Sequence, residues 1–380
     1  MTPTYYEFFA GGGMVRAGLG AGWRCLLAND FDARKCASYR ANWGGETLVE
    51  RDVRDLQASQ LPGLADLVWA SFPCQDLSLA GVGAGLAGAR SGAFWPFCGL
   101  IASLRMEGRH PPLLALENVC GALTSHGGRD FAAICAALAE QGYRFGALVV
   151  DAALFAPQSR PRLFIVAARA DLPLAPALLG DAPAPLFGTP ALDAAFAALP
   201  ESLRSQWLWW KLPAPPARNA TLADLIEEAP TGVDWHEPAK TRALLEMMSP
   251  VNRAKVEAAM ATGRRMVGAL YRRTRYGAGG EKLQRAEARF DDIAGCLRTP
   301  AGGSSRQIVL LIEQGRLRSR LISARETARL MGLPEDYALP PRYADAYHLT
   351  GDGVVVGVVR HLAAHLFEPA LAAMRARRAA

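Results

Sequence analysis

Short apolar runs alternate with helix-like, alanine-rich stretches over the first 170 residues, and this alternation constrains the fold more than any other feature. Six runs have the length and composition of buried strands: Tyr5–Phe9, Arg24–Ala28, Leu67–Ala70, Leu113–Leu116, Ala147–Val150 and Leu163–Ala167. Four stretches between them are predicted helices: Val15–Ala21, Ala33–Asn42, Ala93–Met106 and Arg129–Gln141. Strands that alternate with helices predict an α/β fold with a mainly parallel, doubly wound sheet.

Glycine-rich and polar clusters come just after these predicted strands. They are Phe9–Gly13, Asp30, Asp52, Pro73–Gln75 and Glu117–Val119. In doubly wound sheets, ligands bind beyond the carboxyl ends of the strands. The sequence therefore predicts a single binding site along this edge of the sheet.

Composition limits the class of protein. A chain of 380 residues with 51% hydrophobic residues can form two domains, one with a large core. We expect a cytoplasmic protein without a membrane segment, because the N-terminus lacks a basic leader region and no apolar run reaches bilayer length. Seven cysteines without a C-x-x-C pair favour free thiols and no metal site. The net charge of +6 permits a polyanionic partner without requiring one.

The composition changes after Ala170. Residues 171–220 are rich in proline and alanine and carry little charge, which is typical of a linker or an irregular insertion. Four tryptophans then cluster between positions 207 and 235. From about Arg316 the pattern is regular again, with a predicted helix near Ser323–Met331 and a strand followed by a helix over Val354–Phe367.

One cysteine stands in the stretch SFPCQ at 71–75, after an extended apolar segment. Alone, such a cysteine is more often a buried core residue. Three polar clusters follow it in a fixed order, ENV at 117–119, QSRPR at 158–162 and GDGV at 351–354, and FAGGG at 9–13 precedes it. This ordered set resembles the DNA (cytosine-5)-methyltransferase family over nearly the whole chain, except roughly 171–270.

The resemblance implies a Rossmann-like, S-adenosylmethionine-dependent methyltransferase fold with a smaller, irregular target-recognition domain. We expect a catalytic and cofactor-binding domain at 1–170, a target-recognition domain at 171–318, and a return segment at 319–380 that completes the first. Residues 320–334 are similar to the family's motif that supports the recognition domain. Ser323 and Glu326 in this motif also form a capping box.

The strand-end clusters suit S-adenosylmethionine. Asp30 can accept both ribose hydroxyls, Phe31 can cover an adenine face, and Asp52 can receive the adenine amino group. With the resemblance, the expected cofactor-binding set is Phe9, Gly11, Gly13, Asp30, Phe31, Asp52, Val53, Pro73, Asp352 and Val354. The alternatives are a tight strand-to-helix turn for the glycines, helix N-caps for the acids and a hairpin or loop turn at Asp352. The family usually has Glu at position 30, Gly at 51 and Asn at 352.

The same resemblance makes Cys74 the nucleophile that adds to carbon 6 of cytosine. The thiol must ionise near neutral pH, and Arg160 or Arg162 can supply the positive surroundings. Glu117, buried after an apolar run, can protonate ring nitrogen 3, while Asn118 orders the loop. Arg162 is the expected contact to the cytosine carbonyl.

Gln158, Arg160 and Arg162 alternate, so an extended segment projects all three to one side. The alternative is the solvent face of an edge strand. Arginines interleaved with tyrosines in 264–285 suit phosphate and groove contacts, and the alternative there is a solvated basic helix face. The expected substrate-binding set is Gln75, Ser78, Asn118, Gln158, Arg272 and Arg275.

The expected activity is methyl transfer from S-adenosylmethionine to carbon 5 of a flipped cytosine in a specific duplex DNA sequence, through a covalent Cys74 adduct. We expect a monomer whose functional partner can be a cognate restriction endonuclease. The alternatives are a tRNA cytosine-5 methyltransferase of the same fold and a catalytically inactive DNA-binding homologue. A nicotinamide enzyme is disfavoured, because the G-x-G-x-x-G pattern counted from Gly11 ends on Arg16.

Overall fold

The computed structural model describes residues 1–73, 86, 91–276, 279–298 and 306–379. The chain forms two compact units, each described by itself. The first unit comprises Met1–Asp151, Pro161–Pro215 and Val356–Ala380, and the second comprises Ala152–Arg160 and Pro216–Val355. The first unit thus includes most of the proline- and alanine-rich segment at 171–220.

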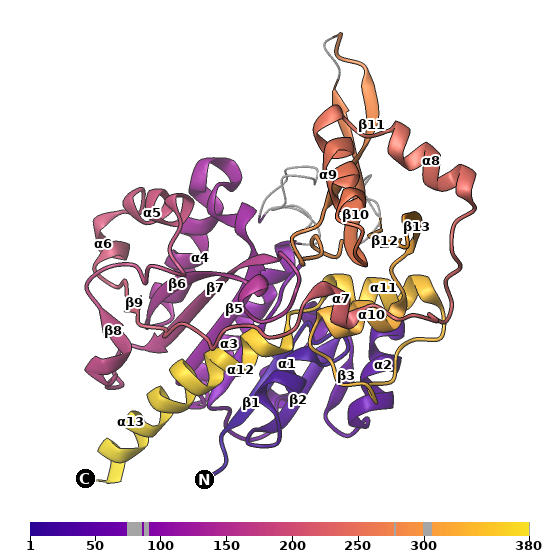
Figure 1. The fold of residues 1–380 in the computed structure, drawn as a ribbon. Coiled ribbons are helices and arrows are strands. Elements are labelled where there is room, and N and C mark those ends of the chain that lie inside the picture. The colour runs from indigo at the N-terminus through magenta and orange to yellow at the C-terminus, as the bar shows by residue number, and fades with distance from the viewer. Residues whose placement is uncertain (74–85, 87–90, 277–278, 299–305, 380) are drawn as a thin grey trace. The chain divides into compact units, whose positions relative to one another are not determined.

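A seven-stranded sheet forms the centre of the first unit, in the order β3-β2-β1-β4-β5-β7-β6 (Figure 1). The strands are β1 (Thr4–Phe8), β2 (Arg24–Asp30), β3 (Leu48–Glu50), β4 (Leu67–Ala70), β5 (Leu113–Val119), β6 (Tyr143–Asp151) and β7 (Pro161–Arg169). Strands β3, β2, β1, β4 and β5 are parallel, and β7 is antiparallel to both β5 and β6. The predicted mainly parallel sheet is confirmed. The short strand β3 was not among the predicted strands.

Helices cover both faces of this sheet. The helices of the first unit are α1 (Met14–Leu19), α2 (Ala33–Trp43), α3 (Phe94–Met106), α4 (Arg129–Glu140), α5 (Pro190–Ala197), α6 (Glu201–Arg204), α12 (Val356–Leu362), the π-helical turn η10 (Ala363–Phe367) and α13 (Glu368–Ala379). On one face Phe8 of β1 meets Phe97 of α3, with ring centroids 5.3 Å apart. On the other face Trp69 of β4 meets Phe367 of η10 at 6.3 Å. The sheet is therefore doubly wound.

The strand expected at Val354 is wrong. Val354 and Val355 are buried and lie outside regular structure, and the valine-rich run continues as helix α12. This helix packs on α1 where Gly18 leaves room: a Cβ at Gly18 would lie 2.4 Å from the Cβ of Val359. A short apolar run cannot be assigned to strand or helix by periodicity alone, and here tertiary packing decides.

The stretch Tyr343–Ala376 is long and apolar enough, by length and composition, to cross a membrane, with a mean hydropathy of 1.3 in its most apolar window. The expectation that no such run exists is therefore wrong. In the structure 61% of that window is buried. Burial of this extent is typical of core helices, and the stretch comprises α11 (Tyr343–Asp352), a short irregular segment, α12, η10 and most of α13.

Residues 206–208 cover the edge strand β6 of the large sheet. Phe145 donates to the carbonyl of Gln206 at 3.1 Å and accepts from the amide of Leu208 at 2.7 Å. Trp207 packs against the rings of Phe131 and Phe145. The segment thus satisfies backbone groups that an uncovered edge would expose.

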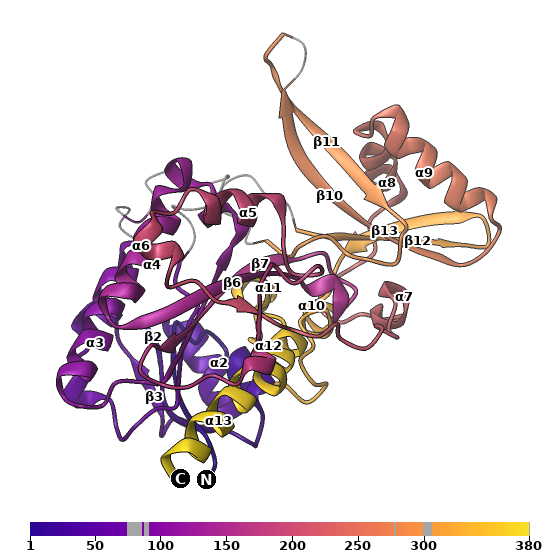
Figure 2. The ribbon, with the colours of Figure 1, turned by 90° about the vertical axis from the view of Figure 1, so that its left-hand side faces the viewer.

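A four-stranded antiparallel sheet forms the centre of the second unit, in the order β11-β10-β12-β13. Its strands are β10 (Met266–Tyr276), β11 (Lys282–Arg289), β12 (Ile308–Glu313) and β13 (Arg316–Leu321). Its helices are α7 (Leu222–Leu225), α8 (Pro238–Glu246), α9 (Pro250–Ala261), α10 (Ala324–Leu330) and α11 (Tyr343–Asp352). The basic segment at 264–285 is therefore a β-hairpin, which Figure 2 shows beside α8 and α9, and the basic helix alternative is wrong.

A buried ion pair connects β13 to α10 in this unit. Arg320 and Glu326 both have fully buried side chains, and Arg320 Nη1 donates to Glu326 Oε2 at 2.8 Å. The same glutamate accepts from the amide of Glu227 at 2.7 Å and completes the expected capping box with Ser323. A buried charge pair requires such additional hydrogen bonds, and this one has them.

We predict opposite effects for the same substitution at two glycines. A Cβ at Gly146 would lie 1.8 Å from the carbonyl oxygen of Leu208, whereas Gly99 lies in helix α3 with nothing within 4 Å. Gly146→Ala is expected to lower the free energy of unfolding by about 1–3 kcal/mol through overpacking. Gly99→Ala is expected to raise it by roughly 0.5–1 kcal/mol.

Urea denaturation of the two variants and the parent chain measures both changes. An unchanged stability of Gly146→Ala would contradict the close approach of residues 206–208 to β6.

Candidate functional site

The turn after β1 has an unusual backbone. Phe9 has φ of 58°, and Gly11 and Gly13 have φ of 57° and 78°. A bulky residue at positive φ is a true conformational outlier, and such outliers concentrate at functional sites. A Cβ at Gly11 would meet no atom of the described residues within 4 Å, so glycine serves the backbone angle at this position. At Gly13 a Cβ would lie 2.5 Å from Nε1 of Trp43, so no larger residue fits.

Asp30 at the end of β2 is 7% exposed and ties this turn in place. Its Oδ2 accepts from the amide of Gly11 at 2.8 Å, and its Oδ1 accepts from the amide of Asp32 at 2.9 Å. Each carboxylate oxygen can accept a second hydrogen bond, so the bonds leave capacity for two hydroxyl groups. The neighbouring Phe31 is 63% exposed, which is unusual for a phenyl ring.

These residues fit an adenosyl group. The carboxylate of Asp30 can bind the ribose hydroxyls, and the exposed ring of Phe31 can lie on the adenine. The open backbone at Gly11 permits close approach. Asp52 has a second role in the structure, because it caps the turn Val53–Asp55 and pairs with Arg54 at 2.9 Å. Val53 is 3% exposed and packs in the core, and Pro73 ends the described segment after β4.

Glu117 of β5 and Arg162 of β7 form an ion pair at 3.3 Å between Arg162 Nε and Glu117 Oε1. The register places Val119 opposite Arg162, so Glu117 is the diagonal neighbour of Arg162 on the same face of the sheet. Both side chains are mostly buried, with exposed fractions of 9% and 16%. The structure thus brings together a carboxyl and a guanidinium that the sequence places 45 residues apart.

Asn118 links the end of β5 to the segment after β4. Its Nδ2 donates to the carbonyl of Phe72 at 3.2 Å, and its Oδ1 accepts from the amide of Val119 at 2.9 Å. Phe72 also packs on Phe94 of α3, with centroids 5.2 Å apart. These contacts fix the chain two residues before Cys74. Cys74, Gln75 and Ser78 themselves lie outside the described residues.

Gln158 and Arg160 belong to the second unit, where both are buried. Arg160 donates to the carbonyls of Gly351 at 2.8 Å and Gly353 at 2.6 Å. Gln158 donates to the carbonyl of Leu330 at 3.0 Å and accepts from the amide of Leu297 at 3.2 Å. The expected extended segment begins only at Pro161, so these two residues do not continue strand β7. They bind backbone groups within their own unit.

Asp352 is the last residue of α11, and Val354 follows it in a buried, irregular segment. The hairpin alternative for this motif is wrong, because it ends a helix. Arg272 and Arg275 lie exposed on the β10–β11 hairpin. Arg275 pairs with Glu287.

Glu7 in the middle of β1 was missed by the sequence analysis. Its side chain is 1% exposed, and Oε2 has no hydrogen-bond partner among the residues that the structure describes. Burial raises the pKa of Glu7 to about 8, with Arg16 opposing and the charge of Asp30 reinforcing the rise. The only signal in the sequence is an acid inside the run YYEFF.

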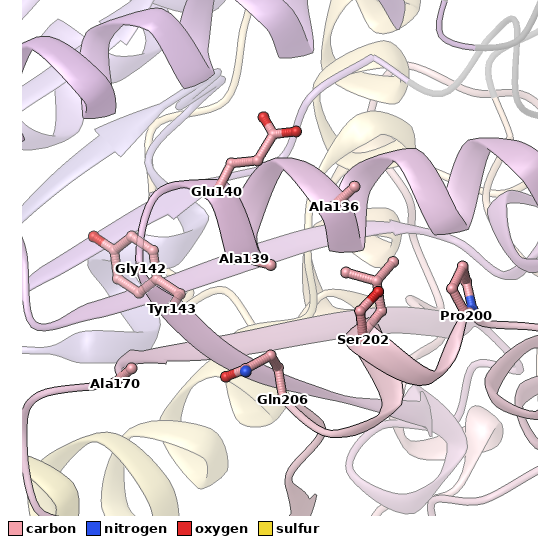
Figure 3. Close-up of a pocket in the computed structure, with 10 residues that line it drawn as sticks. Ala136, Ala139, Glu140, Gly142, Tyr143, Ala170, Pro200, Ser202 and Gln206 are labelled. Carbon is pink, nitrogen blue, oxygen red and sulfur yellow. The ribbon is translucent and has the colours of Figure 1, made fainter.

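A cavity of about 630 Å³ lies away from these residues, between α4, the start of β6 and α6 (Figure 3). Ala139, Tyr143 and Gln206 surround it. None of the predicted site residues within the described part of the chain lines it, so we assign no catalytic role to it.

The family model for "C-5 cytosine-specific DNA methylase" matches residues 4–368 of the chain. The type II methyltransferase M.NlaX of Neisseria lactamica is 26% identical over 94% of each chain. The type II methyltransferase M.PspPI of Psychrobacter sp. (strain TA137) is 34% identical over 44% of this chain and 39% of the relative. The chain thus aligns with about two fifths of that relative's length.

Solved structures agree on the fold. The Dnmt2 methyltransferase of S. pombe has a TM-score of 0.60 and 17% identity, covering 97% of this chain and 98% of its own. The methyltransferase EhMeth of Entamoeba histolytica has a TM-score of 0.63 and 14% identity, with 97% and 98% covered. Identities this low support the methyltransferase fold and nothing finer.

The chain belongs to the C-5 cytosine-specific DNA methylase family, since the family model covers nearly all of it. This membership confirms the resemblance found in the sequence. It also confirms the expected enzyme class, a DNA (cytosine-5-)-methyltransferase. The family uses S-adenosylmethionine, as expected.

We predict that Asp30→Asn weakens binding of S-adenosylmethionine at least about 10-fold, because hydrogen bonds to a charged acceptor contribute about 1.5–3 kcal/mol. The matched control is Asp32→Asn, which changes the N-cap of α2 two residues further on. Isothermal titration calorimetry of both variants measures the affinities. Equal affinities in the two variants would contradict the role assigned to Asp30.

Proposed function

We propose that this chain transfers a methyl group from S-adenosylmethionine to carbon 5 of cytosine in a specific duplex DNA sequence. The observation that carries the proposal is the ion pair of Glu117 with Arg162 at 3.3 Å, beside a segment that leads into Cys74. A carboxyl, a guanidinium and a thiol are the groups that addition to a pyrimidine ring requires. Family membership supplies the substrate class.

Bound S-adenosylmethionine would supply an electrophilic methyl group. On the protein side, Asp30 would hold the ribose and Phe31 the adenine, while the open backbone at Gly11 would leave room for the rest of the cofactor. The buried core under Val53 and the rigid turn keep this edge in one geometry before the cofactor arrives. Preorganised contacts of this kind lower the cost of binding.

Cytosine carbon 5 is a weak nucleophile until a thiolate adds to the ring. The sulfur of Cys74 forms a bond to carbon 6, and the electron pair of the carbon 5–carbon 6 double bond becomes available at carbon 5. Glu117 must carry a proton for this step. It gives that proton to ring nitrogen 3, and Arg162 contacts the ring carbonyl. Carbon 5 would then bond to the methyl group, and the electron pair of the broken methyl–sulfur bond would stay on the sulfur of the cofactor. Carbon 5 loses its proton to a base, the carbon 5–carbon 6 double bond forms again as the sulfur of Cys74 leaves with its electron pair, and ring nitrogen 3 returns its proton to Glu117.

Arg162 has two tasks in this scheme. Its Nε pairs with Glu117, while its Nη1 donates to the carbonyl of Pro161 at 2.9 Å. The guanidinium therefore holds the carboxyl in one place and keeps positive charge beside the ring. Such a positioned pair supports proton transfer more than two mobile side chains do.

The second unit would contain the target-recognition part, since its β10–β11 hairpin carries a dense set of arginines. Duplex DNA is a polyanion that such a surface attracts. The target cytosine must leave the helix stack to reach a pocket at the sheet edge, which costs a few kcal/mol. We propose a cytoplasmic, monomeric enzyme that protects DNA from a cognate restriction endonuclease.

We predict that Cys74→Ser abolishes methyl transfer, because a hydroxyl does not ionise near neutral pH. The control is Cys120→Ser. Cys120 lies near Arg162, and burial raises the pKa of its thiol, so it stays protonated. Bisulfite sequencing of plasmid DNA from cells that express each variant reports activity and sequence context. A parallel assay of purified enzyme on tRNA separates the two substrate classes.

Retained methylation in Cys74→Ser would contradict the mechanism. Transfer to tRNA without transfer to duplex DNA would contradict the DNA assignment and favour the tRNA alternative.

We predict that Glu117→Gln lowers kcat about 100-fold or more, since positioned proton transfer contributes about 10²–10⁴-fold. Arg162→Ala is expected to cost a similar factor, and the double variant little more, because the two groups act as a unit. Arg169→Ala is the control, because Arg169 lies at the other end of β7 and pairs with Asp171. Single-turnover kinetics measures each step. Additive losses in the double variant would show that the two groups act separately.

A further inference from the structure

The β10–β11 hairpin has two faces of different character. The register sets Tyr271, Arg273 and Arg275 opposite Glu287, Arg285 and Leu283, so these six residues share one face, which we call the arginine face. The other face carries Arg272, Thr274, Tyr276, Lys282 and Gln284, with Arg272 opposite Ala286. Nearer the base of the hairpin, that second face continues as buried Leu270, Ala286 and Ala288, which pack in one core cluster with Leu244 and Val256. These two residues belong to α8 and α9, the helices that Figure 2 shows beside the hairpin.

Glu287 organises the arginine face. Its Oε1 accepts from Arg275 Nε at 2.9 Å and from Arg275 Nη2. Arg273 Nε lies 3.7 Å from Oε2, and the guanidinium of Arg273 lies 4.6 Å from the centroid of the Tyr271 ring. The glutamate is largely shielded, with 19% of its side chain exposed, while 52% of the Arg275 side chain is exposed. A carboxylate and a ring therefore hold two outward-facing arginines in fixed positions.

The contacts of Arg275 determine which of its donors remain. A guanidinium has five N–H groups in a planar fork. The N–H of Nε and one N–H of Nη2 point toward Glu287. The second N–H of Nη2 and one N–H of Nη1 form a parallel pair of donors on another edge of the guanidinium. Two parallel donors of this spacing match O6 and N7 of guanine in the major groove, the commonest specific arginine contact in DNA complexes. A single phosphate oxygen needs no such alignment.

Arg273 and Arg285 face each other directly across the two strands. Like charges directly opposite in a sheet destabilise it, so an anion near this pair would relieve the repulsion. The phosphate backbone on either side of a groove supplies such anions. The second face lacks this arrangement, because Gln284 donates to Thr274 at 2.8 Å and these side chains satisfy each other.

We infer that the arginine face enters the major groove of the substrate DNA, where Arg275, held by Glu287, reads a guanine of the recognition sequence and Arg285 binds a phosphate. A two-stranded β-ribbon fits the width of this groove. Arg275 is the specificity-determining residue, and Glu287 is a positioning residue. The inference rests on the proposed DNA methyl transfer and adds to it one base of the recognition sequence.

The test uses the full chain and a DNA library with randomised positions around cytosine. Bisulfite sequencing after limited methylation gives the sequence preference of the parent chain, which is expected to contain an obligatory guanine. Arg275→Ala is expected to reduce the preference for that guanine over adenine about 10-fold or more, with other positions unchanged. Arg275→Lys keeps the charge without the paired donors, and it is expected to reduce the guanine preference as Arg275→Ala does.

Three further variants complete the test. Glu287→Gln is expected to reduce the same preference, and the double variant with Arg275→Ala is expected to add nothing. Arg285→Ala is expected to weaken binding to all sequences equally and to reduce the slope of log affinity against log salt by about 1. Lys282→Ala removes one positive charge from the other face and is expected to leave the preference unchanged. Circular dichroism confirms that each variant is folded.

The possible results distinguish a failure of the role inferred for Arg275 from a failure of the proposed DNA methyl transfer. If the parent chain methylates one sequence and Arg275→Ala keeps the same preference with uniformly weaker binding, Arg275 contacts phosphate and the inference is overturned alone. If Lys282→Ala changes the preference and Arg275→Ala does not, the other face reads the bases. If the parent chain methylates no DNA, the proposed function fails and the inference fails with it.

Discussion

The carboxylate of Asp30 is the interaction on which the sheet edge depends. It binds the amide of Gly11 after β1 and the amide of Asp32 before α2, at 2.8 Å and 2.9 Å. These two bonds hold the end of β2, the glycine turn and the start of a helix in one geometry. The positive φ of Phe9 is strained, and strain persists only where the surroundings hold it. Without this carboxylate the amide of Gly11 would lose the partner that holds the turn to the end of β2.

The buried charged side chains of the two units differ in their exposure and in their hydrogen-bond partners. In the second unit the Arg320–Glu326 pair is fully buried and surrounded by backbone partners, which is a structural arrangement. In the first unit Glu117 and Arg162 retain some exposure near a strand end, as the proposed contact with a base requires. Glu7 is a third case, since its pKa of about 8 favours the neutral form at neutral pH. Because the folded-state pKa lies above the ordinary value, folding loses stability as pH rises from about 4.5 toward 8.

Local pattern predicted most of the large sheet, because buried parallel strands are continuous apolar runs with helices between them. It predicted the strand-end positions of Asp30 and Glu117 for the same reason. The local pattern predicted the wrong secondary structure where tertiary contacts determine it. The valines around Val354 form a helix because Gly18 admits Val359, and the basic segment around Arg272 forms a hairpin whose Leu270 and Ala286 are buried by α8 and α9. The register that sets Arg273 opposite Arg285 cannot be read from the sequence at all.

The two arginines of the motif QSRPR, Arg160 and Arg162, alternate in the sequence but have different surroundings in the structure. Alternation predicts that Arg160 and Arg162 project together, but β7 begins at Pro161, and the two guanidinium groups meet different partners. Arg160 is 2% exposed and donates to the carbonyls of Leu297, Gly351 and Gly353. Carbonyl oxygens take up its donors, so its positive charge serves to connect this motif with GDGV at 351–354. Arg162, paired with a carboxyl at a strand end, is then the arginine of the motif whose position suits chemistry at the ring.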